Sequence, residues 1–231
     1  MGRSEVFDKV FKGIEFDIIP EKTALLIIDM QYLDAHRDYG MGAEAKREGI
    51  EYKYDYYFKQ LHSVVIPNTQ RLLAACRKSG IQVIYPRIAS LVQDCRDVSI
   101  EHKRINLLAS AKSRESDILD EIKPIKNEIV ISKGASGVFN ATAIDQILRN
   151  MGIDTLLMTG VITNYCVETA VRDAGDRGYN VVLVDDACAA MSEEHQKLAL
   201  EILAGVYCVV KDTTQVIHEV EGGLRAVVGR K

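Results

Sequence analysis

Three polar residues stand at the ends of three separate apolar segments. Asp29 closes TALLIID, Lys133 closes EIVISK, and Cys166 follows TLLMTGVITNY. A carboxylate, an ammonium and a thiol together provide what a cysteine nucleophile needs, because Asp29 could take the thiol proton and Lys133 would stabilise the thiolate. No histidine lies in a comparable position, so histidine is not the obvious base. The three residues therefore predict nucleophilic catalysis by Cys166.

Each of the three also has an ordinary structural explanation. Cysteine is among the most frequently buried residues, a strand-terminal Asp is often a cap or turn residue, and a Lys usually reaches solvent along its aliphatic stem. The functional hypothesis depends on their combination, because the carboxyl ends of parallel strands lie along one edge of a sheet. The remaining cysteines are expected to be packing or surface residues: Cys76, Cys95, Cys188 and Cys208.

Alternating strand-like and helix-like segments must position these residues. The strand-like runs are continuously apolar, which is typical of parallel strands covered on both faces; they are 23–30, 81–88, 128–133, 154–161, 180–190 and 206–210. Helices are expected at 65–80, 140–152, 166–178 and 192–205, with a short last one from 213, Asn140 and Ser192 as N-caps, and Gly80 and Gly152 as stops. This rhythm predicts an α/β fold of three layers, a doubly wound, Rossmann-like, six-stranded parallel sheet.

Two long connections interrupt the rhythm. Residues 31–64 include the tyrosine-rich EYKYDYYF at 51–58, and residues 89–126 form a second insertion. Both leave from the carboxyl ends of strands, where open α/β sheets bind ligands, so both are expected to serve function or partner binding. The tyrosines of 52–57 could close the site, lie at a subunit interface or pack in the core. Without repeats or a linker, residues 1–231 are expected to form a single domain.

Composition narrows the class of protein. Lys+Arg 29 against Asp+Glu 33 gives a net charge of −4, which argues against nucleic-acid binding. Five cysteines without a CxxC pair indicate reduced thiols and a cytoplasmic location. No apolar run approaches 18 residues, so no membrane span is expected. The N-terminal 20 residues lack the apolar core of a signal peptide, and Val6 argues against myristoylation.

From about Thr23 to Val210 the sequence resembles the isochorismatase-like cysteine hydrolases. This family includes nicotinamidases, N-carbamoylsarcosine amidases, ureidoacrylate amidohydrolases and biuret hydrolases. The resemblance is carried by ALLIIDMQ, SKGASGVFNAT and TGVITNYCVETAVRDAGDRGY, in that order. It implies that Asp29 is the base, Lys133 the electrostatic stabiliser and Cys166 the nucleophile. It also implies the isochorismatase-like hydrolase fold and a homo-dimer or homo-tetramer.

The resemblance further implies a cis peptide between Val161 and Ile162. It implies that the Ile162 and Cys166 N–H groups form an oxyanion hole, whose donors typically stabilise a transition state by roughly 2.7–4 kcal/mol each. The expected reaction is hydrolysis of a small amide, carbamoyl or ureide through a thioester, with release of ammonia or an amine. True isochorismatases of this family lack the cysteine, so Cys166 favours C–N bond hydrolysis.

Metal and cofactor requirements differ within the family. Nicotinamidases carry an Asp-x-His metal segment after the second strand, where this sequence has YPRIAS (85–90), so no catalytic metal and no cofactor are expected. A DAH segment at 34–36 offers two possible ligands without a third, and it is interpreted as a polar loop. Two alternatives remain open: a nicotinamidase-type amidase, and a catalytically idle binding or scaffold protein.

Candidate substrate-binding residues lie around the predicted strand ends. Arg87 could hold a substrate carboxylate through two hydrogen bonds or form a structural ion pair. Asn164 could hydrogen-bond the loop before the nucleophile, and Phe139 could form a wall of the pocket. Tyr32 and His36, or Asp34 beside them, could line it from the first insertion.

Overall fold

The computed structural model of the chain describes residues 13–228, and side chains as far as residue 222. Residues 1–12, on which the expectations about a signal peptide and myristoylation largely rest, lie outside the described residues. No helix among the described residues is both long enough and apolar enough to cross a membrane.

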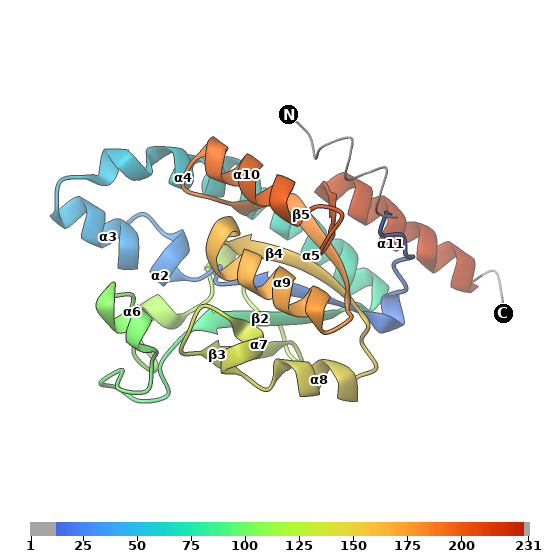
Figure 1. Cartoon of the computed structure of the whole chain (residues 1–231), viewed down its shortest axis with the longest axis horizontal. Helices are drawn as coiled ribbons and strands as arrows, with labels where there is room; N and C mark the ends of the chain where they lie inside the picture. The colour runs from blue at the N-terminus through green and yellow to red at the C-terminus, as the bar shows by residue number, and fades with distance from the viewer. Residues whose placement is uncertain (1–12, 229–231) are drawn as a thin grey trace.

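Across residues 13–228, six parallel strands form one sheet in the order β3-β2-β1-β4-β5-β6 (Figure 1). Their bounds are β1 Thr23–Ile28, β2 Gln82–Ile88, β3 Ile129–Lys133, β4 Thr155–Val161, β5 Asn180–Ala189 and β6 Val209–Lys211. The chain order reverses between β1 and β4, as in doubly wound nucleotide-binding sheets. The predicted fold is confirmed. Only β6 is displaced, because residues 206 and 207 belong to the turn that follows the preceding helix.

Helices cover both faces of the sheet (Figure 1). Alternate side chains of a strand point to opposite faces. Leu25 and Ile27 of β1 accordingly pack in one apolar cluster with α5 (Ile66–Ser79) and α11 (Thr213–Val228). Leu26 and Ile28 pack in a second cluster with α8 (Ile144–Asn150) and α9 (Glu168–Asp176). Burial on both faces explains the continuous apolar runs of the sequence.

Two of the predicted helix boundaries are confirmed at single residues. Gly80 ends α5 in the left-handed conformation, with φ 74°, which a glycine adopts without a Cβ clash. Ser192 precedes α10 (Glu193–Leu203), and its hydroxyl accepts a hydrogen bond from the backbone N–H of His195 at 3.2 Å. The last helix, α11, is longer than the short one expected.

The helix expected over 140–152 is two shorter helices, α7 (Val138–Ala141) and α8. The prediction of Asn140 as an N-cap is wrong, because Asn140 lies inside α7. Thr142 occupies the junction, where its hydroxyl accepts a hydrogen bond from the Ile144 N–H at 3.1 Å. The Thr142 hydroxyl thus gives a backbone N–H a hydrogen-bond partner that does not require helical conformation, which favours the break between α7 and α8.

The first insertion is largely helical, with α2 (Tyr32–Ala35), α3 (Gly40–Arg47), η2 (Glu51–Tyr54), α4 (Asp55–Gln60) and η3 (Leu61–Val65). The second contains α6 (Ile100–Arg104), η4 (Arg114–Ser116) and η5 (Asp120–Ile122). The tyrosine-rich segment contributes to the core through Tyr57, which is completely buried, whereas Tyr52 is 64% exposed. The Tyr57 hydroxyl donates to the backbone carbonyl of Asp34 at 3.0 Å, which ties α4 to α2.

Candidate active site

The carboxyl-terminal edge of the sheet brings Asp29, Lys133 and Cys166 together. Asp29 follows β1, Lys133 ends β3, and Cys166 follows β4. The Lys133 Nζ lies 2.9 Å from Oδ2 of Asp29 and 3.5 Å from Sγ of Cys166, and it also donates to the Ala135 carbonyl at 3.1 Å. All three catalytic candidates are buried, Asp29 and Lys133 with 1% exposure each. The ammonium thus bridges the carboxyl group and the thiol.

A tight turn carries Asp29 off the end of β1. Its φ of 53° lies in the left-handed region, which Asp and Asn enter more readily than most side chains. Its N–H donates to the Pro86 carbonyl at 2.9 Å, and its own carbonyl accepts from the Gln31 N–H at 2.8 Å. These backbone bonds fix the turn from two neighbouring segments, so the position of the carboxyl group is determined by the sheet.

Cys166 lies in η6, a wide π-type turn over Thr163–Val167 that leads into α9. The prediction that residue 166 begins the helix is therefore wrong by two residues. The turn is anchored by the Thr163 hydroxyl, which donates to Oε1 of Gln196 on α10 at 2.7 Å. The peptide bond between Val161 and Ile162, immediately before this turn, is cis.

Burial and charge together set the protonation of the site. Burial raises the pKa of Asp29 above its ordinary value, against the opposing attraction of Lys133. Burial acts to lower the pKa of Lys133, but Asp29 and Cys166 outweigh it and the pKa is raised. Burial, and after it the charge of Asp29, raises the pKa of Cys166 far above the ordinary thiol range. The resting nucleophile is therefore a thiol beside a protonated lysine, rather than a preformed thiolate.

A cavity of about 650 Å³ opens above these residues. Asp29 and Cys166 form part of its lining, together with Val161 and Ile162 from the end of β4 and its following residue. Both insertions contribute to the wall, the first through Asp34 and the second through Glu101, Ile105 and Leu107. The cavity is large enough for a small organic substrate, and the thiol lies at its surface.

Among the other predicted site residues, Asn164 lines this cavity, whereas Arg87, Phe139, Tyr32 and His36 do not. Phe139 is in the core, with its ring centroid 5.9 Å from that of Tyr179. We assign no substrate contact to these four side chains.

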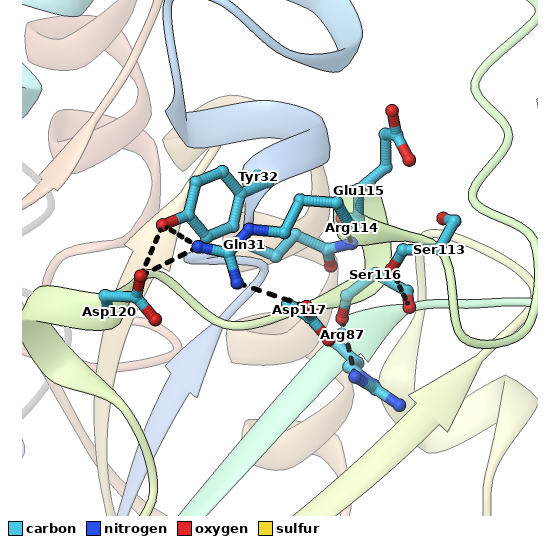
Figure 2. A network of polar contacts seen from close by, with 9 residues as sticks. All are labelled: Gln31, Tyr32, Arg87, Ser113, Arg114, Glu115, Ser116, Asp117 and Asp120. Atoms are coloured by element: carbon cyan, nitrogen blue, oxygen red, sulfur yellow. Dashed lines mark hydrogen bonds and ion pairs between the residues drawn. The ribbon is translucent and has the colours of Figure 1, made fainter.

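Tyr32 and Arg87 instead hold the second insertion against the sheet (Figure 2). The Arg87 guanidinium donates to the Ser116 carbonyl at 2.6 Å, and the Tyr32 hydroxyl donates to Asp120 at 3.1 Å. The guanidinium carbon of Arg114 lies 3.7 Å from the centroid of the Tyr32 ring. The sequence allowed a structural ion pair as one alternative for Arg87. Arg87 does have a structural contact, but its partner is a backbone carbonyl and not a carboxylate.

Gln31 adds a buried link in the same network (Figure 2). Its Nε2 donates to the carbonyls of Ile88 at 2.8 Å and Glu115 at 2.9 Å, while its Oε1 accepts from the Ile88 N–H at 2.6 Å. The sequence offered no individual signal for this role. Gln31 connects the turn after Asp29, the end of β2 and the second insertion.

The two polar residues of the DAH segment have different environments. Asp34 is buried at the cavity, whereas the His36 ring stacks on Tyr32 and its Nδ1 accepts from the Asp38 N–H at 3.1 Å. In the portion of the chain that the structure describes, no group of three or more His, Cys, Asp or Glu side chains is arranged to hold a metal ion.

Several lining residues were not singled out from the sequence. Ser136 lies three residues after Lys133, within a motif that does carry a signal. Tyr165 lies within the nucleophile turn, and Thr169 follows it at the start of α9. Glu101 lies in the second insertion, where neither periodicity nor spacing indicates a role.

Comparison with known proteins identifies the family and supports the fold. The Isochorismatase domain model matches residues 23–215. Ureidoacrylate amidohydrolase RutB of Acinetobacter baylyi is 31% identical over 188 residues, which is 74% of this chain and 72% of that protein. The RutB of Pantoea ananatis is 31% identical over 199 residues, with 78% of this chain and 75% of that protein covered.

Solved structures give the same result for the fold. A cysteine hydrolase from Pseudomonas syringae pv. phaseolicola superposes with a TM-score of 0.78 at 24% identity, over 93% of this chain and 99% of that chain. N-carbamoylsarcosine amidase from Thermoplasma acidophilum superposes with a TM-score of 0.64 at 26% identity, over 83% and 96% of the two chains.

Proposed function

The chain belongs to the isochorismatase family, and we propose that within it the protein is a cysteine hydrolase that cleaves a C–N bond of a small amide, carbamoyl or ureide substrate. Relatives named ureidoacrylate amidohydrolase and N-carbamoylsarcosine amidase support this class of reaction. The observation that carries the proposal is the convergence of three groups on one cavity. The Lys133 Nζ is 2.9 Å from Asp29 and 3.5 Å from the Cys166 sulfur, and the last two residues line the cavity.

The first step is attack by sulfur on the substrate carbonyl carbon. Because burial and Asp29 raise the pKa of Cys166, the thiol keeps its proton until it attacks. Asp29 takes that proton as the S–C bond forms, acting as a general base. Lys133 remains protonated and contacts both partners, so its charge stabilises the carboxylate before the transfer and the sulfur anion during it.

The second step is collapse of the tetrahedral intermediate. We assign the oxyanion to the backbone N–H groups of Ile162 and Cys166, beside the cavity that both residues line. Loss of one such donor typically lowers a rate by about 10²–10³-fold. Asp29 returns its proton to the leaving nitrogen, which departs as ammonia or an amine and leaves a thioester on Cys166. Water, deprotonated by the same carboxylate, then hydrolyses the thioester and frees the thiol.

The proposal extends to the domain organisation, the cellular compartment and the oligomeric state of the protein. The described strands form one sheet over residues 23–211, which supports a single catalytic domain. All five cysteines are free thiols, which supports a reducing compartment such as the cytoplasm. A homo-dimer or homo-tetramer is expected, and light scattering after size exclusion measures it.

Ammonia release from a panel of small amides, carbamoyl compounds and ureides tests the proposal. The wild-type protein is expected to hydrolyse at least one of them, and Cys166→Ala none. Acid quenching during turnover followed by intact-mass measurement should detect an acyl group on the wild-type chain. Absence of turnover across the panel, or equal turnover by Cys166→Ala, contradicts the proposal. An unmodified, inactive protein would correspond to the idle scaffold.

A further inference from the structure

Asp34 lines the cavity and has no role in this mechanism. Asp34 is 5% exposed and lines the same cavity as Asp29 and Cys166. Its Oδ2 atom is buried and has no hydrogen-bond partner among the residues that the structure describes. Its backbone is held by Tyr57, whose hydroxyl donates to the Asp34 carbonyl at 3.0 Å. The carboxyl group is thus fixed at the cavity wall with an unsatisfied acceptor, an arrangement that burial normally disfavours.

The charge of the cavity wall is acidic. Besides Asp29, both Asp34 and Glu101 line it, and within the described portion of the chain no Lys, Arg or His does so. Lys133, behind the wall, is engaged by Asp29 and Cys166. Arg87 is engaged by the Ser116 carbonyl. A substrate carboxylate would therefore lose its water here without meeting a free cation.

The nearest histidine does not change this charge. His102 is completely buried behind the wall, and its Nε2 contacts the Ser136 hydroxyl at 3.3 Å. Burial, followed by the charge of Lys133, lowers the pKa of His102, so the ring is neutral near pH 7.

Among the described residues, the buried side-chain atoms of the wall that lack a hydrogen-bond partner are acceptors. Oδ2 of Asp34 is one, and Oδ1 of Asn164 is a second. The N–H groups of an amide, a ureide or an ammonium group would satisfy them, whereas a carboxylate would bring two further acceptors. On the premise of the proposed hydrolase function, we propose that Asp34 is a specificity-determining residue that binds an N–H donor of uncharged or cationic amide and ureide substrates and excludes carboxylate-bearing ones.

The electrostatics of the site favour this role. Burial, and then the neighbouring Asp29, raises the pKa of Asp34 well above its ordinary value, with Lys133 opposing. A protonated carboxyl group still accepts an N–H through its carbonyl oxygen, and the positive end of a cationic ligand favours the ionised form, which accepts more strongly.

Three ligands that share a ureido group test the proposal. They are (3-hydroxypropyl)urea, (2-aminoethyl)urea and 3-ureidopropanoate, which carry a neutral, a cationic and an anionic end. Calorimetric titration of Cys166→Ala measures binding without turnover. The first two ligands are expected to bind at least about tenfold more tightly than 3-ureidopropanoate, a difference of about 1.4 kcal/mol.

The Asp34→Asn change in the same background should reverse the preference. Its amide keeps the shape of the side chain and offers N–H donors, so 3-ureidopropanoate should gain about tenfold in affinity while (2-aminoethyl)urea loses about tenfold. Asp38→Asn is the matched control. Asp38 lies on the same insertion, outside the residues that line this cavity, where it pairs with Lys46 at 3.5 Å, and its substitution should leave the ratio unchanged.

The outcomes separate this proposal from the hydrolase function. Equal or tighter binding of 3-ureidopropanoate, loss of all three affinities alike in Asp34→Asn, or no binding of any ligand overturns the role of Asp34. Selective binding by Cys166→Ala without ammonia release by the wild-type protein refutes hydrolysis of these ligands and leaves the selectivity intact. Ammonia release with equal use of the carboxylate ligand refutes the role of Asp34 alone.

Discussion

The Lys133 ammonium lies 2.9 Å from a carboxyl oxygen of Asp29, and both side chains are almost completely shielded from solvent. Taking two charges out of water is costly, so such a pair contributes little net stability compared with apolar residues. Its value here is chemical, because the same ammonium is 3.5 Å from the Cys166 sulfur. When a proton moves from the Cys166 thiol to Asp29, the negative charge moves from the carboxylate to the sulfur. The Lys133 ammonium is next to both groups, so it stabilises that charge before and after the transfer.

Removal of the ammonium is expected to destabilise the protein and abolish turnover. Lys133→Met leaves the buried Asp29 carboxyl group without its partner, and breaking a buried pair costs about 3–5 kcal/mol. Urea unfolding measures the loss. The double variant Lys133→Met/Asp29→Asn should recover a large part of the stability but no activity, because neither charge remains. Additive losses in the double variant would contradict the coupling between these residues.

Substitution of Asp29, the proposed base, is expected to accelerate alkylation of Cys166 and to slow turnover. Burial and the Asp29 anion together raise the pKa of Cys166. The Asp29→Asn change removes the anion and keeps Lys133, so the thiol pKa falls and the thiolate forms more easily. Alkylation of Cys166 by iodoacetamide at neutral pH should therefore accelerate, by about tenfold for each pKa unit lowered. Turnover should fall by about 10²–10⁴-fold because the general base is lost.

Peptide mass spectrometry measures that alkylation at Cys166 itself. Cys166→Ala serves as the control for labelling at the other cysteines, all of which are buried. Slower alkylation of Asp29→Asn than of the wild-type protein would indicate that Asp29 activates the resting thiol, and it would contradict the protonated state expected from burial and the charge of Asp29.

The protonation of Asp34 predicts a pH-dependent stability difference. Its folded-state pKa lies above the ordinary value near 3.9, so between the two values the folded state binds a proton that the unfolded state has released. Stability from this group is present at low pH and is lost as the pH rises through that window. Asp34→Asn lacks the titrating group, so its advantage over the wild-type protein should grow by about 1.4 kcal/mol per pH unit and then level off.

Urea unfolding of both proteins from pH 5 to pH 8 measures this difference. The groups that face Asp34 are Asp29, Lys133, Cys166 and Tyr57, and all four are present in both proteins. Asp38→Asn, at an exposed position of the same insertion, is the control variant. A constant or shrinking advantage of Asp34→Asn would mean that the Asp34 carboxyl group is ionised in the folded protein throughout.

The fold was predictable because burial on both faces leaves continuous apolar strands, and the positions of Asp29, Lys133 and Cys166 follow from where three of those strands end. The break at Thr142 was not predictable, because a hydroxyl competes locally with a helix that periodicity alone supports.

The cavity wall was harder to predict than the catalytic centre. Arg87 lies near the end of β2 and Asp34 shortly after β1, and both were candidates, but the paths of the two insertions decide between them. Because Ser116 lies against Arg87, that guanidinium is turned to a carbonyl, whereas Asp34 is held at the cavity by Tyr57. Contacts between segments that are distant in the sequence leave no periodic pattern in the sequence, so they could not be predicted from it.

Gly160 of β4 pairs with Ile28, the residue immediately before Asp29. Its φ is +113°, and an added Cβ would lie 2.0 Å from the Ile28 carbonyl oxygen. Gly160→Ala must therefore push β4 away from β1 at the point where both strands lead into the site. Combined overpacking and backbone strain should lower the free energy of unfolding by roughly 3–5 kcal/mol. A displacement of about 1 Å at Asp29 or Cys166 should lower turnover of the folded fraction by about 10²-fold.

Gly152→Ala is the matched control for this change. Gly152 also has a positive φ, +72°, but an added Cβ meets no atom of the described residues within 4 Å. Only the cost of the left-handed backbone remains, roughly 1–2 kcal/mol, and turnover should be unchanged. Urea unfolding and ammonia release by both variants measure the two effects. Equal losses in the two variants would mean that backbone conformation, and not the contact between β1 and β4, makes glycine necessary at position 160.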